Sequence, residues 1–120
     1  MASMDGYVEI TFKCTSSKDK TLLSDYIQKE LNEAKSRSGY DESYIDEYSW
    51  LTESFWKPGD LSIGCDLVDE HSGDTVQEFL QGVIDAGIDA EFTADVSIFD
   101  LMHGESVCEE RFDSKTMRNA

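Results

Sequence analysis

The sequence predicts an α+β fold, a two-layer sandwich in which two helices pack on a mainly antiparallel sheet of four or five strands. Two stretches alternate apolar and polar residues with a period of two, as strands with one buried face do. Two other stretches repeat apolar residues every three or four positions, as amphipathic helices do. At 120 residues the chain has room for a single hydrophobic core, so one domain is expected.

The first strand and the first helix are expected within the first forty residues. Residues 7–14 alternate, and their even-numbered side chains are the apolar ones. Apolar residues from Leu22 to Ala34 then recur at helical spacing, and Gly39 supplies a left-handed stop after them. These patterns predict a strand followed by a helix.

The segment from Asp41 to Trp56 fits both a helical stripe and strand alternation. A helix would bring the like charges of Glu42 and Asp46 together at i, i+4, and the aromatic and β-branched content favours a strand, so a strand over Ser43–Leu51 is predicted. If residues 43–55 are helical instead, the fold stays two-layer α+β with a different topology. The turn Lys57-Pro58-Gly59-Asp60 and a strand over 61–67 follow.

The last third of the chain predicts a second helix and a long strand. Thr75-Val76-Gln77-Glu78 has the spacing of a capping box, and the helix that it would start ends at Gly87. Residues 88–98 then alternate without interruption between an apolar face and an acidic face. A short edge strand is expected over 107–112.

The element order is therefore βαββαβ plus a possible edge strand, which is typical of a ferredoxin-like α+β sandwich. Residues 1–112 are expected to form the single domain, and residues 113–120 a flexible C-terminal tail. Element order alone says little about function, because unrelated activities occur on such sheets.

The net charge of −16 is concentrated in the middle of the chain. Residues 1–40 hold six acids and six bases, whereas residues 41–110 hold nineteen acids and one base, Lys57. Like charges at this density repel one another and destabilise the compact state, so this excess of acidic residues needs a physical explanation. Solubility alone is one reason, and a functional acidic surface is the other.

The functional interpretation is an acidic inhibitor that imitates nucleic acid. Outward carboxylates on a strand stand about 6.6 Å apart, which matches every second phosphate of a DNA strand at about 3.4 Å per nucleotide. Such a surface would bind the basic groove of a nucleic-acid-binding protein or complex. In size and charge the chain resembles phage-encoded counter-defence proteins of the anti-CRISPR or anti-restriction type. Direct binding of nucleic acid is disfavoured by phosphate repulsion.

Two acidic groups are the candidate partner-binding residues. The first surrounds a run of aromatic residues, and aromatic anchors within a charged rim are common at protein interfaces. The second lies on the polar side of the long strand at 88–98. The candidate residues are Asp41, Glu42, Asp46, Glu47 and Glu53 in the first group, and Asp89, Glu91 and Asp95 in the second.

No catalytic, cofactor-binding or metal-binding residues are assigned from the sequence. Cys14, Cys65 and Cys108 form no CxxC pair, and phosphate-binding glycine loops and nucleophile motifs are missing. Neither a membrane span nor a signal peptide is visible, so a cytoplasmic protein is expected, in the host cytoplasm if the chain is phage-encoded. The alternatives are an immunity protein that neutralises a basic nuclease toxin, a small metal-dependent enzyme, and an acidic adaptor subunit.

Overall fold

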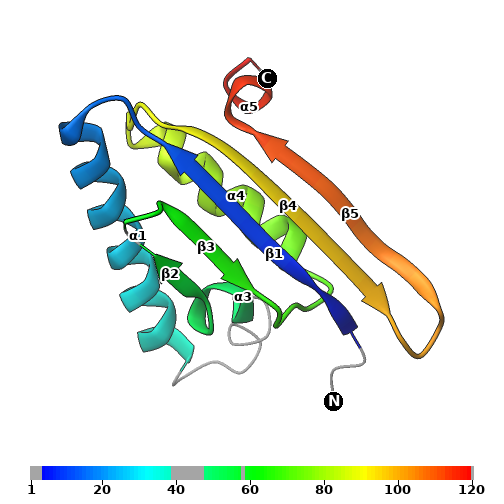
Figure 1. Cartoon of the computed structure of the whole chain (residues 1–120). Helices are drawn as coiled ribbons and strands as arrows, with labels where there is room; N and C mark the ends of the chain where they lie inside the picture. The colour runs from blue at the N-terminus through cyan, green and yellow to red at the C-terminus, as the bar shows by residue number, and fades with distance from the viewer. Residues whose placement is uncertain (1–3, 39–47, 58, 120) are drawn as a thin grey trace.

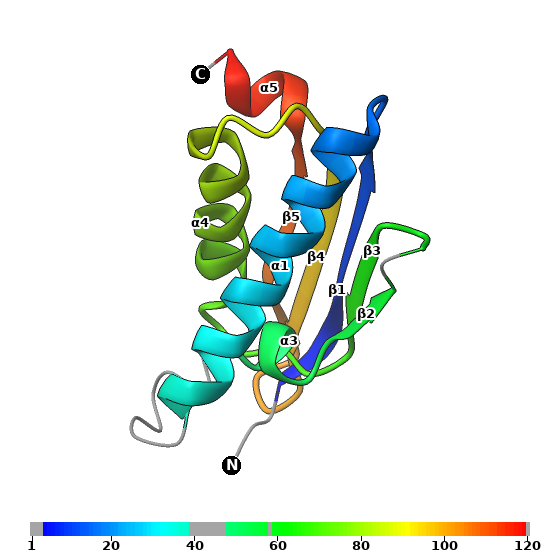
Figure 2. The same ribbon diagram turned by 90° about the vertical axis from the view of Figure 1, so that its left-hand side faces the viewer.

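A computed structural model describes residues 4–38, 48–57 and 59–119, which form helices packed on one face of a five-stranded antiparallel sheet (Figure 1). The strand order is β2-β3-β1-β4-β5. The strands are β1 (Met4–Lys13), β2 (Phe55–Lys57), β3 (Ser62–Cys65), β4 (Glu91–Asp100) and β5 (Glu105–Asp113). The helices of the described residues are α1 (Ser17–Ser38), α3 (Ser49–Thr52), α4 (Ser72–Asp85) and α5 (Ser114–Arg118). Figure 2 shows α1 and α4 on the same side of the sheet, as the sequence predicts.

The two central strands carry the alternation that the sequence predicts. In β1 and β4 the even-numbered side chains from Val8 to Phe12 and from Phe92 to Ile98 are buried against the helices, and their neighbours point away. The register pairs Ile10 with Ala94 and Phe12 with Phe92, so the two buried faces coincide. The strand predicted to begin at residue 88 begins at Glu91.

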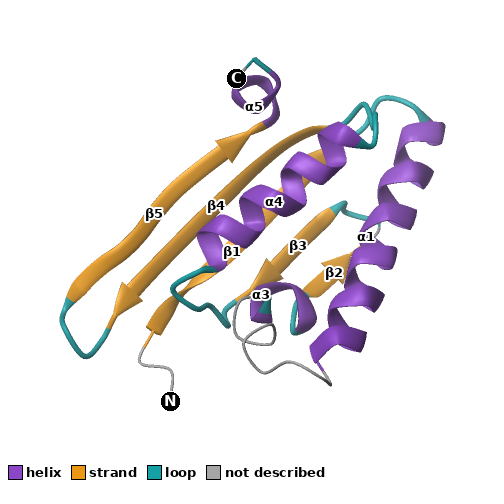
Figure 3. Ribbon diagram, turned by 180° about the vertical axis from the view of Figure 1, so that it is seen from behind, coloured by secondary structure: helices purple, strands orange, loops and turns teal. Residues whose placement is uncertain are grey.

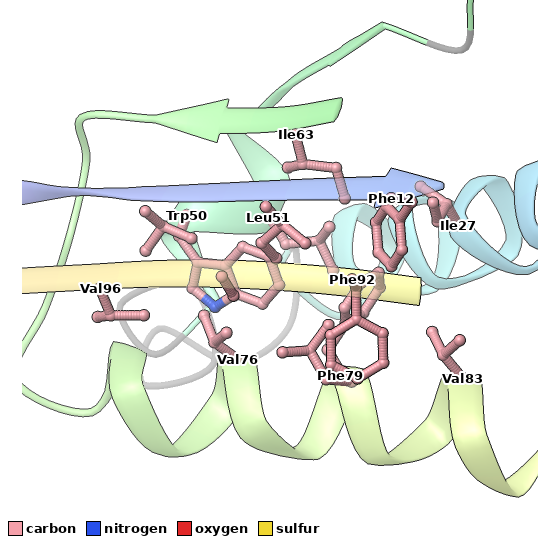
Figure 4. Packing of buried hydrophobic residues seen from close by; sticks show 14 of the residues in the cluster. Phe12, Ile27, Trp50, Leu51, Ile63, Val76, Phe79, Val83, Phe92 and Val96 are labelled. Carbon is pink, nitrogen blue, oxygen red and sulfur yellow. The ribbon is translucent and has the colours of Figure 1, made fainter. Parts of the chain in front are cut away.

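The core lies between the sheet and the helices, and Trp50 occupies its centre (Figure 4). The Trp50 side chain is fully buried, its ring packs edge-on against Phe79 with centroids 5.4 Å apart, and its indole Nε1 donates a hydrogen bond of 2.8 Å to the Thr75 hydroxyl. Aromatic packing and a satisfied indole N–H together make this side chain a strong contributor to the core.

The predicted strand over Ser43–Leu51 is wrong for residues 49–51, which belong to the short helix α3; residues 43–47 lie outside the described part of the chain. The physical reason is that Trp50 and Leu51 are neighbours and both are buried, at 0% and 2% exposure. A strand with one buried face alternates inward and outward side chains and cannot bury two neighbours in a row. The strand of this region, β2, comes later, at Phe55–Lys57.

The helix ends also differ from the capping pattern in the sequence. Helix α4 starts at Ser72, one turn before the predicted capping box, and the hydroxyl of Thr75 is buried and donates to the Ser72 carbonyl. A side-chain N-cap lies instead at α1, where Ser16 Oγ accepts from the Asp19 backbone N–H and donates to the Asp19 carboxylate. Gly87, the predicted stop of the second helix, follows α4 with a φ of +75°.

The C-terminal residues, where the sequence predicts an edge strand and a tail, form β5 and the short helix α5 (Figure 3). The Asp113 carboxylate caps α5 by accepting from the Thr116 N–H at 2.7 Å. Ser114 Oγ accepts from the Phe92 N–H of β4, and the Arg118 guanidinium donates to the Ile88 carbonyl. These bonds tie α5 to the end of the sheet. Among the described residues, no helix combines the length and apolar character needed to cross a membrane.

Candidate functional site

The candidate site is the open face, which we define as the side of the sheet that faces away from α1 and α4 (Figure 2). In the described part of the chain no helix or loop covers it. Its side chains follow from the register of the five strands. The residues of this face are Asp5, Tyr7, Glu9, Thr11 and Lys13 of β1; Phe55 and Lys57 of β2; Ser62 and Gly64 of β3; Glu91, Thr93, Asp95, Ser97 and Phe99 of β4; and Ser106, Glu109, Arg111 and Asp113 of β5.

One row of this face crosses all five strands and brings two carboxylates together. The register aligns Phe55, Gly64, Glu9, Asp95 and Arg111 on neighbouring strands. Glu9 and Asp95 are direct cross-strand partners, so two like charges stand side by side. Arg111 approaches Asp95 from the other side, with its Nε 3.6 Å from the Asp95 Oδ1. This ion pair is largely exposed, so it offsets only part of the repulsion.

A groove of about 580 Å³ lies on the open face beside this row. Its floor includes Gly64, where a Cβ atom would meet nothing within 4 Å. Phe55 and Leu67 line it and are 73% and 55% exposed. Three acids, Glu9, Glu53 and Asp66, also line it, together with one base, Lys57. The groove thus combines apolar walls with negative charge, as a binding site for an alkyl chain ending in a cation does.

A smaller hollow of about 260 Å³ lies on the other half of the open face. Tyr7 and Ser97 line it together with the charged side chains of Asp95, Glu109 and Arg111. Acids and an aromatic ring are therefore close together on both halves of the face.

The open-face acids repeat at four-residue steps on three strands. The pairs are Asp5 and Glu9 on β1, Glu91 and Asp95 on β4, and Glu109 and Asp113 on β5. Four residues of a strand span about 13 Å. This distance is close to the axial rise of four nucleotides in B-DNA, at about 3.4 Å each. Bases interrupt the pattern, because Lys13 is the cross-strand partner of Glu91.

The candidate residues of the sequence analysis fall into three groups. Asp41, Glu42, Asp46 and Glu47 lie outside the described residues. Glu53 lines the groove, and Glu91 and Asp95 point outward from β4, so these three share the open face. Asp89 precedes β4, and its backbone N–H donates to the Asp19 carboxylate at the start of α1, so it lies apart from them.

The aromatic residues next to the first acidic group have different roles. Trp50 is core, and Trp56 is half-buried and packs against the core, so neither contributes to the open face. The exposed apolar side chains that line the groove, Phe55 and Leu67, were missed by the sequence analysis. The charged partner Glu9 was missed too, although it lies on the polar side of the first predicted strand. Alternation in residues 7–14 was the available signal for Glu9. Phe55 lies outside the alternating stretches, and the alternation in 61–67 placed Leu67 on the apolar side, whereas the structure exposes it beyond the end of β3.

Acids of the middle segment also lie elsewhere. Asp74, Glu78 and Asp85 are exposed on α4, on the other side of the sheet, and Asp100 and Glu105 lie at the β4–β5 hairpin. The negative charge of the described residues is therefore distributed over both layers. What distinguishes the open face is not charge alone. No described helix packs on this side of the sheet, two carboxylates are neighbours there, and a groove lies beside them.

Local structure shifts the pKa values of Asp100 and of the three cysteines. Asp100 accepts from the backbone N–H groups of Met102 and His103 and contacts the His103 ring at 2.7 Å, and these bonds lower its pKa. Burial raises the pKa of the Cys14, Cys65 and Cys108 thiols, which disfavours the reactive thiolate. Within residues 4–38, 48–57 and 59–119, no three metal-ligating side chains come together to hold an ion.

The open face therefore offers a pair of neighbouring carboxylates and a groove with exposed apolar side chains as a surface for binding. Comparisons with protein-family models, curated proteins and solved structures find no match for this chain.

Proposed function

We propose that this protein is an acidic inhibitor that imitates nucleic acid and uses its open face to occupy the basic surface of a nucleic-acid-binding effector, of the anti-CRISPR or anti-restriction type. The observation that carries the proposal is the pair of neighbouring carboxylates, Glu9 and Asp95, beside a groove with exposed apolar walls. Like charges side by side destabilise a free sheet, so a function that uses them would explain their presence.

The open face supplies both charge and apolar contact for such a partner. Lys and Arg side chains that grip phosphates also pair with carboxylates, and electrostatic attraction makes association fast and salt-sensitive. Within the groove, a guanidinium or ammonium group would lie near Glu9 and Glu53, while its alkyl stem packs against Phe55 and Leu67. Apolar contact gives a selectivity that charge alone lacks.

We also propose that the fold is a ferredoxin-like sandwich and that the protein acts in the cytoplasm. The order β2-β3-β1-β4, antiparallel throughout, supports a ferredoxin-like sandwich extended by β5 and by the short helices α3 and α5. The cytoplasm is where nucleic-acid-binding effectors act, and we propose that the protein acts there too.

The test begins with capture of the partner from a lysate at low salt and its release by high salt. The partner's affinity for its own DNA or RNA is then measured with and without this protein, by fluorescence anisotropy. The wild-type chain should compete with the nucleic acid, and competition should weaken as salt rises.

Matched charge reversals decide whether the open face is responsible. Glu9→Lys with Asp95→Lys should abolish competition, whereas Asp74→Lys with Asp85→Lys on α4 changes the net charge equally and should retain it. Equal losses in both double variants would show that net charge, not the open face, drives binding. A partner whose nucleic-acid affinity stays unchanged in the presence of the wild-type chain would contradict the mimicry itself.

A further inference from the structure

The outer edge of β5 is a second feature with a clear capacity for binding. β5 is nine residues long, about 30 Å, and pairs only with β4 among the described residues. Figure 1 shows it at the end of the sheet, and no described segment runs along its outer side. An edge strand exposes a row of backbone donors and acceptors that another strand can use.

The hydrogen-bond geometry identifies which backbone groups are exposed. The Phe92 N–H donates to Ser114, which directly follows β5, so it points toward β5. Strand residues alternate in direction, so Ala94 and Val96 also point toward β5, where they pair with Phe112 and Glu110. Glu109 and Arg111 alternate with these residues, so their N–H and C=O groups point away from β4.

The side chains of this edge select the kind of strand that could be added. Glu105, Glu109, Glu110 and Asp113 are acidic, and Arg111 is the single base of β5. β5 carries four acids and one base, so two copies paired edge to edge repel overall: a register about Glu109 puts that residue against itself and Asp113 against Glu105, and a register about Glu110 sets Glu109 opposite Arg111 but Glu110 against itself. Nucleic acid is disfavoured for the same reason. The edge is complementary to a cationic polypeptide.

The regular part of the edge is the half that leads into α5. A register shift at Ile98/Phe99 leaves Val107 as an extra residue on β5, and such a bulge interrupts pairing at the hairpin end. From Cys108 to Asp113 each residue has one partner on β4. A strand added here would extend the sheet next to Glu109 and Arg111.

We propose that the outer edge of β5 accepts an extended, basic segment of a partner protein as a sixth strand of the sheet. The backbone groups of Glu109 and Arg111 bond to the added strand, and the acidic side chains on both sides of β5 select lysine and arginine. The proposal does not depend on nucleic-acid mimicry, because it rests on the strand edge and not on the groove or on the Glu9–Asp95 pair.

The experiment uses a capped synthetic peptide as long as β5 in which lysine alternates with threonine. Amide hydrogen exchange is followed by NMR in the full chain. In the free protein the Glu109 and Arg111 amides should exchange fast, and those of Glu110 and Phe112 slowly. Saturating peptide should slow exchange at Glu109 and Arg111 by at least about tenfold. A peptide that alternates glutamate with threonine should not bind.

Variants separate the backbone contribution from the charge. Glu109→Pro removes an outward N–H without breaking the β4 ladder and should weaken peptide binding by at least about tenfold. Glu109→Gln keeps the N–H and removes one charge, for a loss of about two- to fivefold. Glu33→Gln, on exposed α1 surface across the sheet, should leave the affinity unchanged.

The proposal is overturned if the lysine–threonine peptide shows no saturable binding, or if it binds while the Glu109 and Arg111 amides exchange as fast as before. Should Glu109→Pro disturb folding, the exchange measurement on the wild-type chain decides alone. The competition experiment on Glu9 and Asp95 and this one can fail separately, because they use different residues and different probes.

Discussion

The carboxylates of Glu9 and Asp95 repel each other across β1 and β4, so removing one of these charges should stabilise the free protein. The substitution Glu9→Gln keeps the size and shape of the side chain. The Cα atoms of such a cross-strand pair stand about 5.5 Å apart, and two unit charges at that spacing in water repel by about 0.8 kcal/mol. Arg111, 3.6 Å from Asp95, offsets part of this energy. We expect Glu9→Gln to raise the free energy of unfolding by about 0.5 kcal/mol, within the range measured for cross-strand pairs.

The register supplies a control of opposite sign on the same two strands. Glu91 is the cross-strand partner of Lys13, so Glu91→Gln removes an attraction and should lower the free energy of unfolding by a similar amount. Urea unfolding followed by circular dichroism measures both variants. A change of this size moves the midpoint by about 0.3 M urea.

Salt distinguishes a charge effect from a packing effect. Both shifts should shrink in about 1 M NaCl, where the Debye length is about 3 Å. The reasoning is refuted if the two variants shift the midpoint in the same direction, or if the shifts do not change with salt. Either result would mean that these side chains do not face each other as the register requires.

Three further predictions concern the interior and the helix caps. Trp50→Ala should lower the free energy of unfolding by about 3–5 kcal/mol in urea, and a smaller loss would contradict its central position in the core. Gly82→Ala should lower the free energy of unfolding by about 1–3 kcal/mol, because the new Cβ would overlap the Tyr26 hydroxyl. In most helices the same substitution raises it by about 1 kcal/mol. In a Tyr26→Phe background the loss should be smaller, because the overlapping hydroxyl is gone. The Thr116 N–H lowers the pKa of Asp113 in the folded protein. The stability that Asp113 contributes is therefore complete above the ordinary aspartate pKa of about 3.9 and is lost as the pH falls through the lower folded-state pKa. An NMR titration that gives Asp113 an ordinary pKa would contradict this.

The sequence predicts the elements whose burial pattern is regular. The alternation in residues 7–14 and 88–98 identifies the central strands, because each has one face on the core and one in solvent. The apolar stripe from Leu22 to Ala34 likewise identifies α1. For these elements, local pattern and tertiary burial agree.

The prediction was wrong where tertiary contacts override the local pattern. Trp50 is buried through its contact with Phe79 and its bond to Thr75, residues of a helix far away in the sequence. The same bond occupies the hydroxyl that the sequence pattern assigned to a cap. A local pattern contains no information about such a partner, so a strand was preferred to the helical alternative where α3 lies, and the start of α4 was missed.

The candidate site depends even more on long-range pairing. Glu53 and Asp95 were singled out for their charge, but what makes them part of one surface is the alignment of β2, β3, β1 and β4. Glu9 joins them only because β1 lies between β3 and β4. Strand order is a property of the whole chain, so the groove and its walls could not be predicted from runs of acids.

The burial of Trp50 has a consequence for the surface. Helix α3 is a single turn of four residues, too short to persist without tertiary support. The buried indole ring of Trp50 holds α3 against the core, and Glu53 and Phe55 follow α3 within a few residues. The position of one wall of the groove therefore depends on a side chain that is fully buried. An interior substitution that loosened the indole would change the shape of the groove without changing a single exposed residue.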